Sequence, residues 1–229
     1  MVFRTLCLVL IALVSFSFRA IEHQPTDFSD RLYERLSWQE FSQAKIVNQP
    51  IDLDNPDIEL INAAVFYASN QARERQRMSE FAFRSPLRDM ARYHAEQMAR
   101  YHFVSHDNPR SPRYATVQAR GKRFEAQVNA ENVASTFLHR YEGGTRYYIK
   151  RLDGEDAFFD ARTSRQIELH TYWSFGQSIV QGWIDSPSHR RNLFHSQLKT
   201  LGCACEIGAG EIGSGKIPMV YCGQNFGIE

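Results

Sequence analysis

Residues 182–193 read Gly182-Trp-Ile-Asp-Ser-Pro-Ser-His-Arg-Arg-Asn-Leu193. This stretch is predicted to join the end of one helix to the start of another. Apolar residues at helical spacing run up to Trp183, and the Ser186-Pro187 pair then favours a helix stop followed by a new helix, with Ser186 as N-cap. His189 falls in the first turn of that new helix, where the macrodipole disfavours the imidazolium. Its neutral ring is suited to metal binding, to proton abstraction or to hydrogen-bonded packing, and spacing alone leaves the three open.

Two further helices are predicted upstream. Apolar side chains recur at three- and four-residue steps over residues 58–72 and again over 87–101, which puts one apolar stripe on each helix. Asp57 is the expected N-cap of the first helix. Ser85 is the expected N-cap of the second, with Pro86 in its first turn.

The C-terminal part is typical of two antiparallel strands, residues 201–207 and 217–223, around a glycine-rich turn. The turn contains a Gly-x-x-x-x-Gly-Lys pattern ending at Lys216. A phosphate loop needs a hydroxyl next and then a helix, but Ile217 and Pro218 follow, so the pattern indicates a hairpin loop.

Cysteine spacing adds one expectation. Cys203 and Cys205 lie two residues apart, so on a strand they share a face, and Cys222 on the partner strand could meet either. We favour a Cys205–Cys222 disulfide in an exported chain. The alternative is that all three are small buried apolar residues.

The segment 137–171 is rich in charged and aromatic residues, and Asp153-Gly154 within it predicts a β-hairpin. A long insertion of this kind is either a partner surface or lid, or a solvated hairpin without a role in binding.

The N-terminal residues indicate an exported protein. Residues 1–20, with an apolar run over 5–18 that is shorter than the ~20 residues of a membrane-spanning helix, are expected to be a signal peptide. We therefore expect a secreted, extracellular or periplasmic protein without a stable membrane span after cleavage. Residues 21–56 form an extension with one possible helix over 32–41, packed or partly loose, and 57–229 form one domain.

The charge balance excludes one class of function. The 229 residues hold 27 Lys and Arg against 26 Asp and Glu, a net charge of +1. Nucleic-acid binding depends on many phosphate contacts by basic side chains, so this balance argues against a nucleic-acid partner.

Several motifs together resemble the CAP superfamily (SCP domain) of cysteine-rich secretory proteins, antigen 5 and pathogenesis-related proteins. The Trp-x-x-Ser-x-x-His-Arg form is similar to its bacterial branch. The resemblance covers about residues 57–228. It is carried, in order, by Asn70-Gln-Ala-Arg73, Leu87-x-x-Met-Ala-Arg-Tyr-His-Ala-Glu-Gln-Met98, Phe103-Val-Ser-His106, Glu131-Asn-Val-Ala134, the 182–193 stretch, Leu201-Gly-Cys203 and Tyr221-Cys-Gly-Gln-Asn-Phe-Gly227.

That family implies an α+β fold, a three-layer α-β-α sandwich with a small antiparallel sheet between helical layers. It also implies a cleft with two histidines and two acids that binds zinc or another divalent metal in some members. His106, Glu131 and His189 match three of these positions. Ser186 occupies the fourth, where many members have Glu, and neighbouring Asp185 could substitute only if it turned inward.

Two chemistries follow from this set. In the first, two neutral imidazoles and the Glu131 carboxylate bind a zinc ion and leave one position open, as in catalytic zinc sites. In the second, Glu131 does not bind the ion and instead orients a histidine through its ring N–H. We expect a binding module for a metal, small or lipid-like ligand, peptide or protein. The alternative is a peptidase-like hydrolase with His106 or His189 as base, Glu131 as orienter, and metal-bound water or Ser186 as nucleophile, although Ser186 is better explained as an N-cap.

Overall fold

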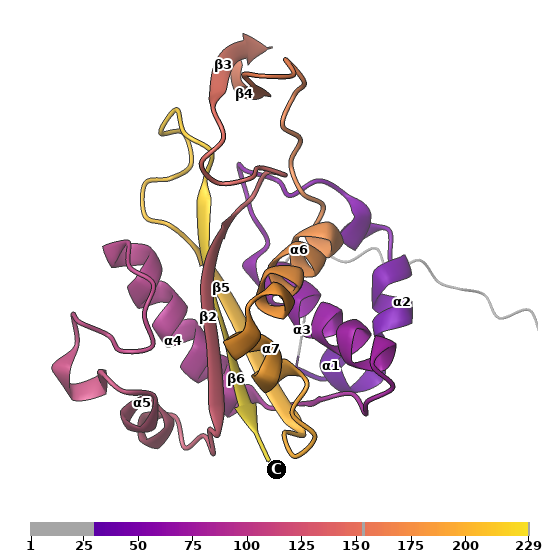
Figure 1. Ribbon diagram of the computed structural model, residues 1–229, viewed down its shortest axis with the longest axis vertical. Helices are drawn as coiled ribbons and strands as arrows, with labels where there is room; N and C mark the ends of the chain where they lie inside the picture. Colours follow the sequence, from indigo (N-terminus) through magenta and orange to yellow (C-terminus); the bar gives the residue numbers. More distant parts are fainter. Residues whose placement is uncertain (1–29, 153, 229) are drawn as a thin grey trace, which may run out of the picture.

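The computed structural model describes residues 30–152 and 154–228, so the expected signal peptide in residues 1–20 lies outside the described residues. A four-stranded sheet stands between two layers of helices (Figure 1), which confirms the α-β-α sandwich. The strand order is β1-β5-β6-β2. The strands are β1 (Ala82–Phe83), β2 (Ala130–Phe137), β5 (Thr200–Ile207) and β6 (Met219–Gly227).

The helices divide between the two faces of the sheet. One layer holds α4 (Ser85–Tyr101), which packs on β5 and β6, and α5 (Val117–Arg123) beside it. The other layer holds α3 (Ile58–Arg75), α6 (Tyr172–Asp185) and α7 (Pro187–Leu193). A 3₁₀ turn (Pro112–Tyr114) precedes α5.

The predicted C-terminal strand pair is confirmed, with Cys205 opposite Cys222 in an antiparallel ladder. A disulfide joins these two residues, and Cys203 is a buried free thiol. The sheet differs from a purely antiparallel one because β1 pairs with β5 in parallel. The connection from α3 to α4 lays these two residues along the free edge of β5, where the Ala82 amide donates to the Lys199 carbonyl.

The predicted helices are present, with one start corrected. The Asp57 carboxylate accepts a hydrogen bond from the Leu60 amide at 3.0 Å and caps α3, as expected. Ser85 is not the N-cap of α4, because the helix already includes it and Arg84 holds the cap position without a side-chain cap bond.

The described part of the N-terminal extension packs on the domain. It forms α1 (Leu32–Arg35), α2 (Trp38–Gln43) and a 3₁₀ turn (Ile46–Asn48), where one helix was expected. Ser37 separates the two helices because it forms a capping box with Glu40 and so starts α2. The buried side chains of the extension join the main core, and they are Tyr33, Phe41, Val47 and Ile51.

The second helical layer depends on a close approach between α3 and α6. Gly176 on α6 lies against α3, so that a Cβ at this position would stand 2.4 Å from the Ala64 carbonyl oxygen. Only glycine permits this separation, which brings the two helices together over the sheet. The core between them is dominated by apolar and aromatic side chains, including Phe66, Phe175, Ile179 and Trp183.

The insertion contains the predicted hairpin, β3 (Tyr147–Leu152) and β4 (Glu155–Asp160), which stands beyond the end of the sandwich (Figure 1). It has a small core of its own, formed by Phe158, Ile167 and Ile217. Ile217 belongs to the turn between β5 and β6. The expected hairpin loop is confirmed there, with positive φ at Gly210, Gly213 and Gly215. No helix in the described parts is long and apolar enough to cross a membrane.

Candidate functional site

The Glu-Asn pair lies at the start of β2, the edge strand of the sheet. Successive side chains on a strand point to opposite faces, so Glu131 and Asn132 point toward different helical layers. Glu131 contacts Arg120 of α5, whereas Asn132 contacts α7. Because β2 is an edge strand, groups from both layers can meet around it.

Glu131 is buried and paired with a buried arginine. Arg120 Nη2 donates to Glu131 Oε2 at 2.9 Å and to Oε1 at 3.1 Å. The same guanidinium donates to the carbonyl oxygens of His106 at 2.8 Å and Ala115 at 2.6 Å. The carboxylate charge is therefore compensated inside the protein, and the loop that carries His106 is tied to α5.

His106 joins this pair through its ring. The distance between His106 Nδ1 and Glu131 Oε1 is 3.0 Å. This hydrogen bond raises the pKa of His106, against the opposing effect of partial burial. The His106 side chain is 52% exposed to solvent, so part of the imidazole is accessible to a ligand.

His189 lies close to His106, with 6.4 Å between the ring centroids. Burial lowers the pKa of His189, and neighbouring His106 lowers it further. Its helix is held on β2 by a buried amide chain, in which Asn132 Nδ2 donates to the His189 carbonyl at 3.2 Å and Asn192 Nδ2 donates to Asn132 Oδ1 at 2.9 Å. Asn132 also donates to Gln224 Oε1 at 3.1 Å. The network fixes the position of α7 and hence of His189.

The two remaining predicted residues have hydrogen-bond partners other than the two histidines. Asp185 ends α6, and its Oδ1 accepts a hydrogen bond from Gln181 at 2.8 Å rather than contacting either imidazole. Ser186 is at the N-cap position of α7 but makes no side-chain cap bond, so the expected bond to a backbone N–H is not formed. Its hydroxyl lies 3.3 Å from the Ser188 hydroxyl.

The side chains thus differ from the ligand set expected for zinc. Within the described residues, no group of three or more His, Cys, Asp or Glu side chains is arranged to hold a metal ion. Both oxygens of Glu131 are occupied by Arg120, and one of them also by His106. The residues fit the alternative in which Glu131 orients His106, so that two imidazoles remain as potential ligands.

Sequence reasoning missed Arg120, the partner that defines the role of Glu131. It lies on α5, a seven-residue helix capped by Thr116 whose hydroxyl accepts from the Ala119 amide at 3.2 Å. A single arginine in a short basic segment resembles a solvated residue. Only the fold shows that it is fully buried.

The sandwich, the edge-strand glutamate and the paired histidines define an SCP-type domain. The chain belongs to the CAP family, since the sequence model of the Cysteine-rich secretory protein family matches residues 66–226. No curated protein matches the chain.

Several solved structures are similar to this chain. An extracellular protein containing an SCP domain from Bacillus anthracis matches at 17% identity and a TM-score of 0.46, over 78% of this chain and 45% of that one. An outer surface protein from Borrelia burgdorferi matches at 10% identity and a TM-score of 0.47, over 79% of this chain and 98% of that one. A cysteine-rich secretory protein from Staphylococcus aureus matches at 10% identity and a TM-score of 0.37, over 72% of this chain and 38% of that one. This chain thus spans less than half of the Bacillus and Staphylococcus chains.

Proposed function

We propose that this protein is an exported binding module whose ligand site is the His106–His189 pair. A divalent metal ion at this site would have the two imidazoles as its protein ligands. Glu131 would position His106 and would not bind the ion itself. The observation that carries the proposal is the 3.0 Å hydrogen bond between His106 Nδ1 and Glu131 Oε1, with Glu131 held in turn by Arg120.

The arrangement has the features of a supported metal-binding histidine. A ring N–H donated from Nδ1 to a carboxylate fixes the tautomer and leaves the Nε2 lone pair directed outward. Histidines that bind metals almost always make such a bond. Two ligands alone bind an ion weakly, so water or a bound molecule such as a peptide would complete the coordination.

The hydrolase alternative gains no support from the described residues. Ser186 has Ser188 as its hydroxyl partner and no histidine, so the base that a serine nucleophile needs is missing. Both oxygens of Glu131 already accept hydrogen bonds from Arg120. A binding role is therefore favoured.

Zinc is the simplest probe of this site. Calorimetric titration at pH 7.5 should give a saturable heat for the full chain, and a His106→Ala/His189→Ala variant should bind at least tenfold more weakly. His195→Ala is the matched control, because this exposed histidine lies just beyond α7 and outside the pair. Glu131→Gln should weaken zinc binding tenfold or more without abolishing it.

Two results of the zinc titration would overturn the proposal. One is an absence of any zinc heat in the unaltered chain, and the other is equal binding by the double-alanine variant. Cleavage of a peptide or ester that depends on Glu131 would replace the binding role with the hydrolase alternative.

A further inference from the structure

A second candidate site lies at the base of the insertion. A cavity of about 530 Å³ opens there between the end of β2 and α6, and its walls include His139, Arg140, Glu142, His170 and Ser178. This volume is in the range of small-molecule sites. The cavity is separate from the histidine pair, since Thr136 in its wall is five residues along β2 from Glu131, or roughly 17 Å.

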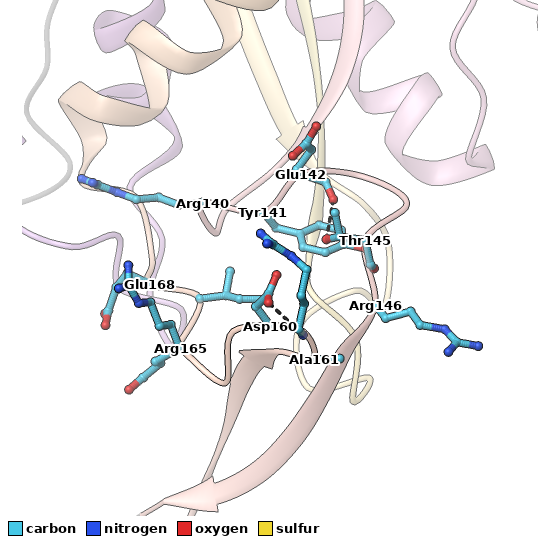
Figure 2. A pocket seen from close by; sticks show the side chains of 12 residues that line it. Arg140, Tyr141, Glu142, Thr145, Arg146, Asp160, Ala161, Arg165 and Glu168 are labelled. Atoms are coloured by element: carbon cyan, nitrogen blue, oxygen red, sulfur yellow. Dashed lines mark hydrogen bonds between the residues drawn. The ribbon is translucent and has the colours of Figure 1, made fainter.

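A larger cavity of about 730 Å³ adjoins it and is lined by charged residues of the insertion loops. Figure 2 shows the side chains of Arg140 and Arg146 pointing in different directions there. Asp160 in its wall is engaged in its own turn, where it accepts from the Thr163 amide and hydroxyl at 2.6 and 2.8 Å. The exposed residues Arg140 and Glu142 line both cavities, so the smaller cavity is distinguished by its buried histidines and not by its charged groups.

Two buried histidines distinguish the smaller cavity. His139 is 6% exposed and His170 is 8% exposed. His139 Nδ1 is buried and has no hydrogen-bond partner among the described residues, whereas His170 Nδ1 lies 3.0 Å from the Ser174 hydroxyl. Burial lowers the pKa of each ring to about 4, so both are neutral hydrogen-bonding groups at physiological pH. Because solvent does not reach Nδ1, a ligand in the cavity would meet the His139 ring through its other edge.

Arg140 supplies a positive charge beside these neutral groups. Among the described residues its guanidinium has no acidic side chain within ion-pair distance and no hydrogen-bond acceptor. Arg140 and His170 line the same cavity, and the positive charge of Arg140 adds to burial in lowering the pKa of His170. Guanidinium groups recognise carboxylates by paired hydrogen bonds. Glu142 lines the same cavity and would repel ligands with additional negative charge.

We propose that this cavity binds a small polar molecule with one carboxylate, such as an amino-acid derivative or the free end of a peptide. The carboxylate pairs with Arg140, and His139 with the Ser178 hydroxyl binds the neutral polar atoms. This ligand class follows from one cation without an ion-pair partner in the described chain, Arg140, beside neutral hydrogen-bonding groups, with Glu142 opposing a second negative charge. It is independent of zinc binding at His106 and His189.

N-acetylglycylglycine and its C-terminal amide form a matched pair of probes, since they differ only in the carboxylate. NMR titration of the full chain should show saturable shifts of the His139 and His170 ring signals with the acid and at least tenfold weaker binding of the amide. The bound carboxylate should also raise the pKa of His170, because it offsets the charge of Arg140. His139 and Arg140 are the groups that act on this pKa besides burial.

Arg140→Gln should weaken binding of the acid at least tenfold, and Arg146→Gln, at an exposed residue that lines only the larger cavity, should leave it unchanged. Ser178→Leu, on the exposed side of α6, fills the cavity without altering Arg140 and should abolish binding. The proposal is overturned by equal affinity for acid and amide, by unchanged affinity in Arg140→Gln, or by tighter binding of inorganic phosphate than of the acid.

Discussion

Arg120 and Glu131 form a buried ion pair that links α5 to the edge of the sheet, with exposed side-chain fractions of 0% and 3%. The guanidinium also donates to the backbone of His106, and the carboxylate accepts from the ring of the same residue. One ion pair therefore positions both the loop and the imidazole of His106. The stability of this helical layer and the geometry of the proposed ligand site therefore depend on the same ion pair.

Replacing Arg120 by Met should lower the free energy of unfolding by about 3–5 kcal/mol, because the Glu131 charge then stays buried without its partner. Urea unfolding followed by circular dichroism measures this loss. The control is the double variant Arg120→Met/Glu131→Leu, which buries no charge and should be more stable than the sum of the two single losses predicts. If the losses add within about 0.5 kcal/mol, the two residues are not coupled.

Local patterns predicted much of this fold. Helical periodicity placed α3, α4 and α6, and the Asp-Gly pair placed the β3–β4 hairpin. The sequence did not predict strand β2. Three consecutive residues from Glu131 to Val133 are buried, so the strand lacks the alternation of apolar and polar residues that marks a strand with one buried face.

The candidate site was only partly predictable. His106, Glu131 and His189 came from a family resemblance, and the structure brings them together. The role of Glu131 depends on Arg120, eleven residues away on another element, which no local pattern links to it. Similarly, His139 and His170 line one cavity only because the chain pairs His139 with Leu169 across the insertion.

Gly176→Ala should destabilise the protein by more than about 3 kcal/mol, since the added Cβ would stand 2.4 Å from the Ala64 carbonyl oxygen and the backbones of α3 and α6 would have to separate. Gly182→Ala is the matched control on the same helix. A Cβ there meets nothing within 4 Å, so this change should stabilise α6 by roughly 0.5–1 kcal/mol. Thermal unfolding of both variants measures the contrast, and similar effects would show that the helices are not in tight contact.

Acidification should destabilise the base of the insertion. The pKa of His139 and of His170 is lowered to about 4 by burial. Between pH 6.5 and 4 the unfolded chain binds protons at these rings that the folded protein does not, so stability is complete above about 6.5 and falls toward 4. Each ring contributes roughly 2–3 kcal/mol to this fall.

The variant His139→Phe/His170→Phe isolates this effect, because it removes both titrating rings. Its free energy of unfolding should fall less than that of the unaltered chain between pH 7.5 and 4.5. Equal falls would show that the two rings titrate normally. His106 acts in the opposite direction, since its raised pKa stabilises the folded state at low pH and this contribution is lost as pH rises through that pKa.

The Cys205–Cys222 disulfide should stabilise the β5–β6 pair. The two cysteines are 17 residues apart in sequence. For a loop of this length, replacing both cysteines by alanine should lower the free energy of unfolding by about 3 kcal/mol. Cys203→Ala, at the buried free thiol two residues away, is the control and should cost about 1 kcal/mol. A double variant that loses no more than the control would show that the bond contributes nothing beyond packing.

The two helix starts at Thr171 and Ser186 should respond differently to alanine. Thr171 caps α6 by accepting from the Ser174 amide at 3.1 Å within a capping box, so Thr171→Ala should cost about 1 kcal/mol. Ser186 is at the N-cap position of α7 but its side chain makes no capping hydrogen bond. Ser186→Ala should therefore cost less than about 0.5 kcal/mol. Zinc binding should also be unchanged in Ser186→Ala, because the hydroxyl contacts Ser188 and neither imidazole. A large loss of stability or of zinc binding in Ser186→Ala would restore this residue to the functional site.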